Sequence, residues 1–370
     1  MKLWIKRSLL FISILFLLAS CGQSEDKTVK DSEEKDVSES NNEVVNDNDS
    51  GNNYEYDLLE IIEKLGKIPN IANMSVIFDG ELIGEEFYGS YRPEAKNNLY
   101  SVTKSVTALL IGIAIEEGYI EGPDQLISDF IDLDEYEVDN EYYDITIGHL
   151  MTMSSGIDWD GSKHIQEFLA LKGSADPLRN ILTRDITSSP GKSFNYSDAS
   201  AHLVAEVLYA ATGELPMNYA EDKLFKPLGI EEAIWPPLKN EVNLGGCDLY
   251  LSCQDMRKIG QLVLNKGIAD GNQLVPSEWI EECTTSQIAT YNTASYGTDY
   301  GYFYWLGTAD GQVETISCLG HGGQYIVIVP EYKLVITVSA YGAVDGNTAG
   351  EQSSAIGRII YGEMLDIFAE

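Results

Sequence analysis

The spacing of apolar residues predicts a β-hairpin followed by a buried helix in the first third of the chain. Met74, Val76 and Phe78 lead to Asp79-Gly80, and a second apolar stretch follows over residues 82–87. Two such stretches around an Asp-Gly pair are typical of a hairpin with a tight turn. From about residue 101, apolar side chains recur at helical spacing, which predicts a helix with a buried stripe: Val102, Val106, Leu109, Leu110 and Ile113.

The middle of the chain has mainly helical patterns, and its end has strand patterns. Helix-like spacing occurs at residues 149–153, 199–212, 217–224 and 253–264. Short β-rich stretches bounded by Gly, Asp or Pro follow at 302–306, 314–319, 324–329 and 333–340, and an amphipathic stretch at 356–368 predicts a closing helix. The fold class is therefore α/β of the α+β type. We expect one antiparallel sheet built from both chain ends and flanked by helices, with a helical second lobe at about 120–240.

The first twenty residues have the pattern of a secretory signal. Lys2, Lys6 and Arg7 precede an apolar run over residues 9–18, which is too short for a membrane-spanning helix of about 20 residues. Leu18-Ala19-Ser20 stands directly before Cys21 and resembles the lipobox of bacterial lipoproteins. That resemblance implies a lipidated Cys21 that anchors an extracytoplasmic protein to the cell membrane. An ordinary cleaved signal with an incidental cysteine is the alternative.

The segment after the signal is predicted to be a disordered acidic tether over residues 21–52. Residues 22–52 contain ten acidic and three basic side chains and few apolar ones. Such a composition buries too little surface to offset the entropy lost on ordering. We expect the folded domain to span residues 53–370.

Charge and cysteine content narrow the range of partners. The chain has 24 basic and 59 acidic residues and a net charge of −35, of which −31 falls on residues 53–370. A field of this sign repels nucleic acid. The five cysteines form no CxxC pair and the histidines number four, so we expect no zinc cluster and no cofactor. We also expect a monomer that binds a small-molecule substrate.

The first candidate for catalysis is Ser101-Val-Thr-Lys104 at the start of the predicted helix. A serine and a lysine three residues apart lie on one helix face, so the ammonium can reach the hydroxyl. The helix N-terminus favours an alkoxide-like nucleophile, and burial is expected to lower the pKa of the lysine. Taken alone the motif is weak, because an N-capping serine beside a surface lysine gives the same letters.

Two later segments strengthen this hypothesis. Phe194-Asn-Tyr-Ser-Asp198 follows a Pro-Gly turn and can present Tyr196, and Gly320-His-Gly-Gly-Gln324 opens a predicted strand against which a substrate can lie. S-x-x-K, Y-x-N and [KH]-[TSG]-G in this order resemble the serine hydrolases that include class C β-lactamases, penicillin-binding D,D-peptidases and related esterases. Residues 145–156, 249–256 and 300–305 extend the resemblance, which is strongest to the esterase and 6-aminohexanoate-dimer hydrolase branch.

The resemblance implies roles for particular residues. Ser101 is the nucleophile, and Lys104 and Tyr196 share its proton as general base and acid. The oxyanion is bound by the backbone N–H groups of Ser101 and Gln324. The residues expected to contact substrate are Asp198, His321, Gly322 and Gly323.

Two departures from the family pattern affect the expected substrate. Asp198 stands where the family more often has Asn, so an acceptor-only carboxylate replaces an amide. His321 replaces a lysine, and a neutral imidazole attracts a carboxylate less than an ammonium does. Asp198 either faces the cleft and repels anionic substrates or caps the helix that follows. His321 is as compatible with a structural role as with substrate contact, and His149 and His202 are expected to be packing or surface residues.

Three functions remain open on these grounds. The favoured one is a lipid-anchored serine hydrolase acting on esters or small amides. The second is a cell-wall D,D-peptidase or β-lactamase with the same mechanism. The third is a non-catalytic sensor that keeps the fold.

Overall fold

A computed structural model of the protein describes residues 54–292, 297–309 and 311–369. The predicted signal peptide, Cys21 and the tether lie outside the described residues. The fold below is therefore that of the predicted domain.

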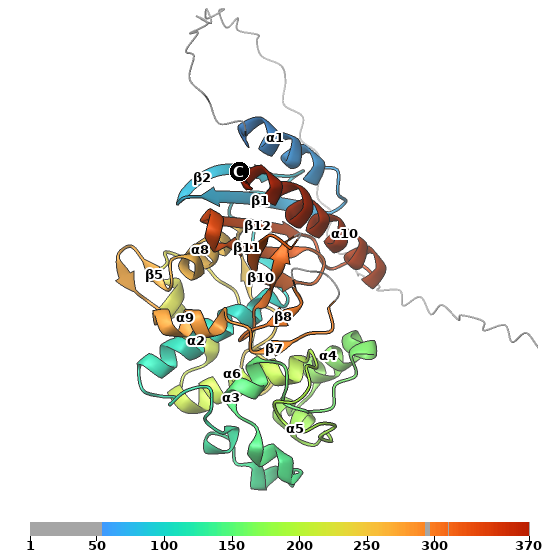
Figure 1. The fold of residues 1–370 in the computed structure, drawn as a ribbon. Helices are drawn as coiled ribbons and strands as arrows, with labels where there is room; N and C mark the ends of the chain where they lie inside the picture. Colours follow the sequence, from blue (N-terminus) through green and yellow to red (C-terminus); the bar gives the residue numbers. More distant parts are fainter. Residues whose placement is uncertain (1–53, 293–296, 310, 370) are drawn as a thin grey trace, which may run out of the picture. The chain divides into compact units, whose positions relative to one another are not determined.

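An antiparallel sheet built from both ends of the domain organises the fold. Within the described residues it has eight strands in the order β2-β1-β12-β11-β10-β9-β8-β7 (Figure 1). The strands are β1 (Ile71–Phe78), β2 (Glu81–Phe87), β7 (Ile288–Ala289), β8 (Asp299–Tyr300), β9 (Trp305–Ala309), β10 (Val313–Gly320), β11 (Gln324–Val329) and β12 (Leu334–Ala340). In the centre Met74 of β1 stands opposite Val338 of β12, so the predicted joining of the two chain ends is confirmed.

Helices cover both faces of the sheet. On one face α1 (Tyr54–Leu65) lies beside α10 (Gly346–Ile359), over a core that includes Met74, Val327 and Ile336 (Figure 1). On the other face α8 (Cys253–Leu264) packs on β11 and β12. Gly260 allows this close approach, because a Cβ there would lie 2.5 Å from Val335 Cγ1. The helices α2 (Val102–Glu116) and α9 (Ser277–Cys283) lie on the same side.

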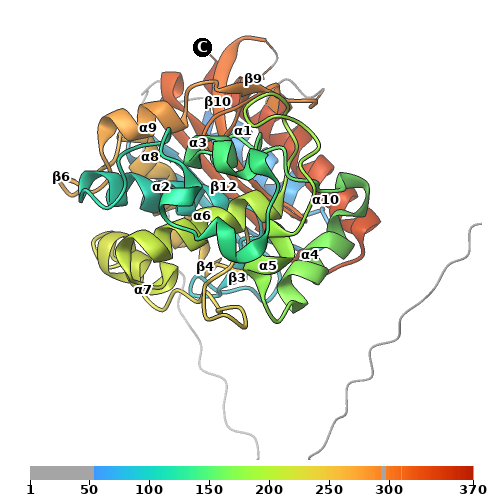
Figure 2. The same ribbon diagram turned by 90° about the horizontal axis from the view of Figure 1, so that it is seen from below.

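The predicted helical lobe is present between α2 and α8. It contains α3 (Ile147–Met151), α4 (His164–Gly173), α5 (Pro177–Leu182), α6 (Asp198–Thr212) and α7 (Pro216–Ala220). Figure 2 shows α6 beside α2, with α3, α4 and α5 around it. All but the last turn of α6 is buried, which makes it the central helix of the lobe.

Short segments complete the described structure. Two-residue strands pair as β3 (Asn97–Asn98) with β4 (Tyr250–Leu251) and as β5 (Ile268–Ala269) with β6 (Asn272–Gln273). Single turns of 3-10 helix lie at Ile127–Asp129, Leu133–Tyr136, Asn140–Asp144, Gly161–Lys163, Pro330–Tyr332 and Leu365–Phe368. Wider π-helical turns continue α7 at Glu221–Phe225 and α10 at Ile360–Met364.

Two sequence predictions need correction. The strand expected at residues 302–306 begins later, as β9 (Trp305–Ala309). The reason is that Phe303 has a left-handed backbone (φ 64°) and lies in a buried loop before the strand. The closing helix expected from residue 356 begins ten residues earlier at Gly346. Asp345 caps it by accepting hydrogen bonds from the N–H groups of Asn347 and Thr348.

In the described part of the chain, no helix is both long and apolar enough to cross a bilayer.

Candidate active site

Ser101 lies at the start of α2, directly after a strained residue. Tyr100 has φ 47°, a left-handed conformation that aromatic residues seldom adopt, and its N–H donates to Asn98 Oδ1 at 2.8 Å. Ser101 occupies the N-cap position, but its side chain makes no capping hydrogen bond. The interpretation of Ser101 as a simple helix cap is therefore wrong, and its hydroxyl is available for other contacts.

Lys104 is a buried lysine whose three donors are all used. Its Nζ donates to Ser101 Oγ at 3.0 Å, to Asp198 Oδ1 at 2.6 Å and to the Gly246 carbonyl at 3.0 Å. The side chain is 1% exposed, so the alternative of a surface lysine is also wrong. An ammonium has three donors and no acceptor, and this set of partners satisfies it completely.

The expected lowering of the lysine pKa does not occur. Burial is the largest single effect and lowers the pKa of Lys104, but the charge and the hydrogen bond of Asp198, together with the neighbouring Tyr196, hold the pKa above its ordinary value. The sequence alone could not predict that the lysine pKa is raised, because Asp198 lies 94 residues from Lys104 along the chain. Lys104 is therefore a fixed positive charge beside the serine hydroxyl.

Asp198 is the first residue of α6, but it does not cap that helix. Ser197 is the cap, since its Oγ accepts from the Ser200 N–H at 3.3 Å. The capping alternative for Asp198 is thus wrong. The carboxylate is 3% exposed; Oδ1 pairs with Lys104, and Oδ2 lies 3.5 Å from His164 Nε2. Asp198 therefore acts as a buried counter-ion of Lys104 and not as an exposed part of the cleft surface.

Tyr196 approaches the same ammonium. Lys104 Nζ lies 4.9 Å from the centre of the Tyr196 ring, which stacks on Trp305 with a centroid distance of 5.6 Å. Burial raises the pKa of Tyr196, while the positive charge of Lys104 acts in the opposite direction. A phenol that is protonated at rest thus stands next to a fixed cation and Ser101.

An open hollow of about 380 Å³ gives access to these groups. It is lined by Ser101, Gly161, His164, Tyr196, Trp305, Leu319, Gly320 and His321. These residues come from α2, the segment around α4, the turn before α6 and the strands β9 and β10. The three motifs that are far apart in the sequence therefore meet at one cleft.

The third motif forms the turn between β10 and β11. Gly320 pairs with Gln324 and approaches the start of α2, where an added Cβ would lie 2.3 Å from the Leu99 carbonyl oxygen. Gly322 and Gly323 have φ 74° and 102°, which only glycine adopts without strain. This packing brings the strand that carries Gln324, predicted to bind the oxyanion, close to the N-terminus of α2.

His321 lies at the mouth of the cleft. Its ring meets the edge of the Tyr100 ring at a centroid distance of 5.3 Å. Burial lowers the pKa of His321, and the charge of His164 lowers it further. The imidazole therefore stays neutral near pH 7.

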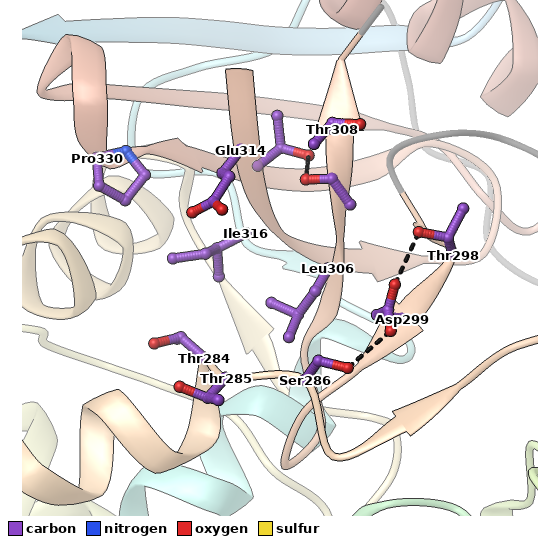
Figure 3. A pocket seen from close by; sticks show the side chains of 12 residues that line it. Thr284, Thr285, Ser286, Thr298, Asp299, Leu306, Thr308, Glu314, Ile316 and Pro330 are labelled. Atoms are coloured by element: carbon purple, nitrogen blue, oxygen red, sulfur yellow. Dashed lines mark hydrogen bonds between the residues drawn. The ribbon is translucent and has the colours of Figure 1, made fainter. Parts of the chain in front are cut away.

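A second hollow, of about 390 Å³, lies between the end of α9 and β8 to β10 (Figure 3). It has two carboxylates, Glu314 and Asp299, and Asp299 already accepts hydrogen bonds from Ser286 and Thr298. No lysine or histidine is among the residues described around it. None of these residues gives a hydroxyl the cationic partner that Lys104 gives to Ser101, so the cleft at Ser101 is the candidate active site.

The remaining histidines and cysteines have structural positions. His149 takes part in the capping box of α3 with Thr146, and His202 is buried in α6 beside Glu206. The described cysteines are buried and unpaired: Cys247, Cys253, Cys283 and Cys318. Among the described residues no group of three or more His, Cys, Asp or Glu side chains is placed to hold a metal ion.

Two residues of the site were not singled out by the sequence. His164 falls in a segment without clear periodicity. Gly246 is needed because a Cβ there would lie 3.0 Å from Lys104 Nζ and 3.1 Å from Asp198 Oδ1. A glycine pair at 245–246 is the signal that could have indicated such a close approach.

Comparison with known proteins gives several relatives. The chain is 22% identical over 315 residues to an uncharacterized protein of Alkalihalophilus pseudofirmus, covering 74% of this chain and 85% of that protein. It is 22% identical over 231 residues to the 6-aminohexanoate-dimer hydrolase of Paenarthrobacter ureafaciens, covering 56% and 55% of the two chains. A solved Bacillus anthracis structure, provisionally described as a 6-aminohexanoate-dimer hydrolase, superposes with a TM-score of 0.68 at 20% identity and covers 85% and 83%.

The fold and the family agree. The solved structure shares the mixed α/β architecture with its antiparallel sheet, as the sequence predicted. The sequence model of the family described as Beta-lactamase matches residues 59–352, which is most of the domain. The chain therefore belongs to the beta-lactamase family and has its serine hydrolase fold.

Proposed function

We propose that the protein is a serine hydrolase of the esterase and 6-aminohexanoate-dimer hydrolase branch, which cleaves an ester or small amide through an acyl-enzyme on Ser101. The observation that carries the proposal is the chain of contacts from Ser101 Oγ to Lys104 Nζ to Asp198 Oδ1. Tyr196 lies over the ammonium and lines, with Ser101, the open hollow. This arrangement supplies a nucleophile, a fixed cation and a proton acceptor within one site.

The positive charge on Lys104 decides which group acts as the base in acylation. Because Lys104 stays protonated, Tyr196 in its phenolate form takes the proton as Ser101 Oγ bonds to the carbonyl carbon. The ammonium of Lys104 stabilises both the phenolate and the developing negative charge on Oγ. The negative carbonyl oxygen is bound by the backbone N–H groups of Ser101 and Gln324. The bond to the leaving group then breaks, and Tyr196 returns the proton to that oxygen or nitrogen.

Deacylation repeats these steps with water. Water gives a proton to Tyr196 and bonds to the acyl carbon, and the carbon–Oγ bond breaks. Tyr196 then protonates Ser101 Oγ. The products are a carboxylic acid and an alcohol or amine.

The walls of the hollow favour a neutral substrate over a β-lactam. Tyr196 and Trp305 provide an aromatic surface, and Lys104 is already fully paired with Asp198. No lysine or arginine is among the residues that line the described cleft, and His321 is neutral near pH 7. Penicillins and cephalosporins carry an obligatory carboxylate, for which the cleft lining offers no cation, since Lys104 lies beneath it and is paired with Asp198.

A labelling experiment and a substrate panel test the proposal. Fluorophosphonate should add once, at Ser101, and the adduct should be absent from Ser101→Ala. Short-chain p-nitrophenyl esters should be cleaved faster than a chromogenic cephalosporin or a D-Ala-D-Ala peptide. Absence of labelling would favour the non-catalytic sensor, and faster cephalosporin or peptide cleavage would favour the cell-wall enzyme.

We also propose that Cys21 is lipidated and holds the domain outside the cytoplasm at the membrane. The support is the Leu18-Ala19-Ser20-Cys21 sequence after a short apolar run. Labelled palmitate should be incorporated into the full chain and lost in Cys21→Ala. Incorporation that persists in this variant would refute the proposal.

A further inference from the structure

His164 is the titratable group of the cleft that no motif accounts for. It is the first residue of α4, and its side chain is 42% exposed. It lines the same hollow as Ser101, Tyr196 and His321. Its ring lies 6.4 Å from that of Tyr196 and 6.5 Å from that of Trp159, measured between ring centres.

When the His164 imidazole is neutral, the charged side chains near it are already paired with side chains of opposite charge. Asp198, whose Oδ2 lies 3.5 Å from His164 Nε2, is already paired with Lys104. On the histidine's own segment Lys163 pairs with Asp160 at 2.7 Å, and Glu167 pairs with Arg184 at 2.9 Å. Protonation of His164 therefore adds a positive charge to a cleft whose nearby ions are otherwise paired.

His321 is the other group that could add such a charge. Burial lowers its pKa, and a charged His164 lowers the pKa of His321 further. A second positive charge in the cleft is therefore disfavoured. His164 also has the Asp198 carboxylate beside it, whereas the neighbour of His321 is the Tyr100 ring.

We propose that His164 determines the charge preference of the substrate site: as a neutral imidazole it leaves the site selective for uncharged acyl chains, and as an imidazolium it admits acyl chains that carry a carboxylate. This inference rests on the proposed function, since it concerns the substrate of the same cleft. Histidine is the side chain whose charge state proteins most often use between pH 5 and 8, so two pH values in that range test the proposal. One partly solvated ion pair contributes up to about 1 kcal/mol, which corresponds to about fivefold in kcat/KM.

Two esters of equal chain length measure this preference. We would compare p-nitrophenyl hexanoate with the mono-p-nitrophenyl ester of adipic acid, which carries a terminal carboxylate. The ratio of kcat/KM for the adipate ester to that for the hexanoate cancels the pH dependence of the common chemical steps. It should rise about fivefold from pH 8 to pH 5.5.

Two histidine variants identify the group responsible. In His164→Gln the ratio should change by less than twofold over the same range, whereas in His321→Gln the rise should persist. A rise that survives in His164→Gln, or that is lost in His321→Gln alone, would overturn the proposal. So would a constant ratio in the unmodified protein.

A binding measurement separates this inference from the proposed function. Monomethyl adipate and methyl hexanoate would be titrated against the full chain with Ser101→Ala, by tryptophan fluorescence, at the same two pH values. Affinity for the adipate should increase about fivefold on acidification, and this increase should require His164. If no ester is hydrolysed but this increase is seen, the proposed function fails and the charge preference stands. If affinity does not depend on pH, the charge preference fails even where hydrolysis occurs.

Discussion

The ion pair between Lys104 and Asp198 is the residue-scale feature with the largest expected energy. Both side chains are almost fully buried, so removing one partner leaves an unpaired charge inside the protein. Asp198→Ala should lower the free energy of unfolding by about 3–5 kcal/mol, measured by urea denaturation. Glu60→Ala is the control, because it breaks an exposed pair with Lys64 within α1 and should cost far less. Equal losses in the two variants would contradict the internal role of Asp198.

Asp198→Asn tests the electrostatic part of the same contact. Asparagine keeps the shape and an acceptor for Lys104 but removes the charge, so burial, the largest effect on the lysine, is opposed less and its pKa falls. A neutral Lys104 no longer stabilises a phenolate at Tyr196. We expect kcat/KM on a neutral ester to fall about 10²-fold while the protein stays folded by circular dichroism. Unchanged activity would show that the charge of Lys104 is not needed.

The pKa of Tyr196 gives a prediction for the pH dependence. Since burial raises this pKa above the ordinary phenol value of about 10, the phenolate fraction increases with pH throughout the range 7–9. On a neutral ester kcat/KM should therefore rise continuously over that range, after subtraction of the rate with Ser101→Ala. Tyr196→Phe should lower the rate by about 10²–10⁴ and remove the slope. A plateau above pH 7 would point to a different base.

At the scale of elements, α4 covers the cleft with little apolar contact of its own. Leu171 is its one buried residue, while Ile165 and Leu169 are more than half exposed. Its ends make polar contacts: His164 lies beside Asp198, and Lys172 forms an ion pair with Asp248. The helix is therefore held mainly by polar contacts and should open more easily than the core helices.

Lys172→Met tests that attachment. Loss of one partly exposed ion pair should speed amide hydrogen exchange over residues 164–173 by up to about fivefold, measured by mass spectrometry. Lys163→Met is the matched control, because its pair with Asp160 lies in the turn before the helix. In Lys163→Met, amide exchange should change only in that turn and not along α4. Equal exchange in both variants would mean that Lys172 does not hold α4.

The elements that the sequence predicts well are those with a strong apolar period. The hairpin of β1 and β2, the helices α2, α6 and α8, and the strand β11 follow their patterns closely. The patterns fail where packing overrides them. Tyr302 to Tyr304 are aromatic and buried like a strand but form a loop, and the first half of α10 is too polar and glycine-rich to look like a helix.

The same distinction holds for the candidate site. Ser101, Lys104 and Tyr196 were indicated by short motifs in a fixed order, which a sequence displays directly. The pairing of Lys104 with Asp198 depends on how α2 and α6 pack, and the position of His164 depends on how α4 lies over them. Such contacts between distant elements have no signature in a single sequence.

For the whole molecule, the dominant property is the net charge of −31 on residues 53–370. At an ionic strength of 0.01 M the Debye length is about 30 Å, so most of this charge acts on a substrate in the cleft. At 0.3 M the Debye length is less than about 8 Å, and only nearby groups act. The long-range field should therefore repel anionic substrates at low salt and lose its effect at high salt.

The dependence of kcat/KM on ionic strength at a constant pH of 8 tests the effect of this field. Between 0.01 and 0.3 M ionic strength, kcat/KM for the adipate monoester should rise several-fold, because screening removes the repulsion. The hexanoate should change little, and an ester with a terminal ammonium should show the opposite trend. The three esters differ in charge more than in size, so opposite slopes for anion and cation cannot arise from a general effect of salt on folding or chemistry. Equal slopes for all three would show that the charge of the domain is too far from the cleft to influence substrate entry, and that selection by charge is set by the residues around Ser101 alone.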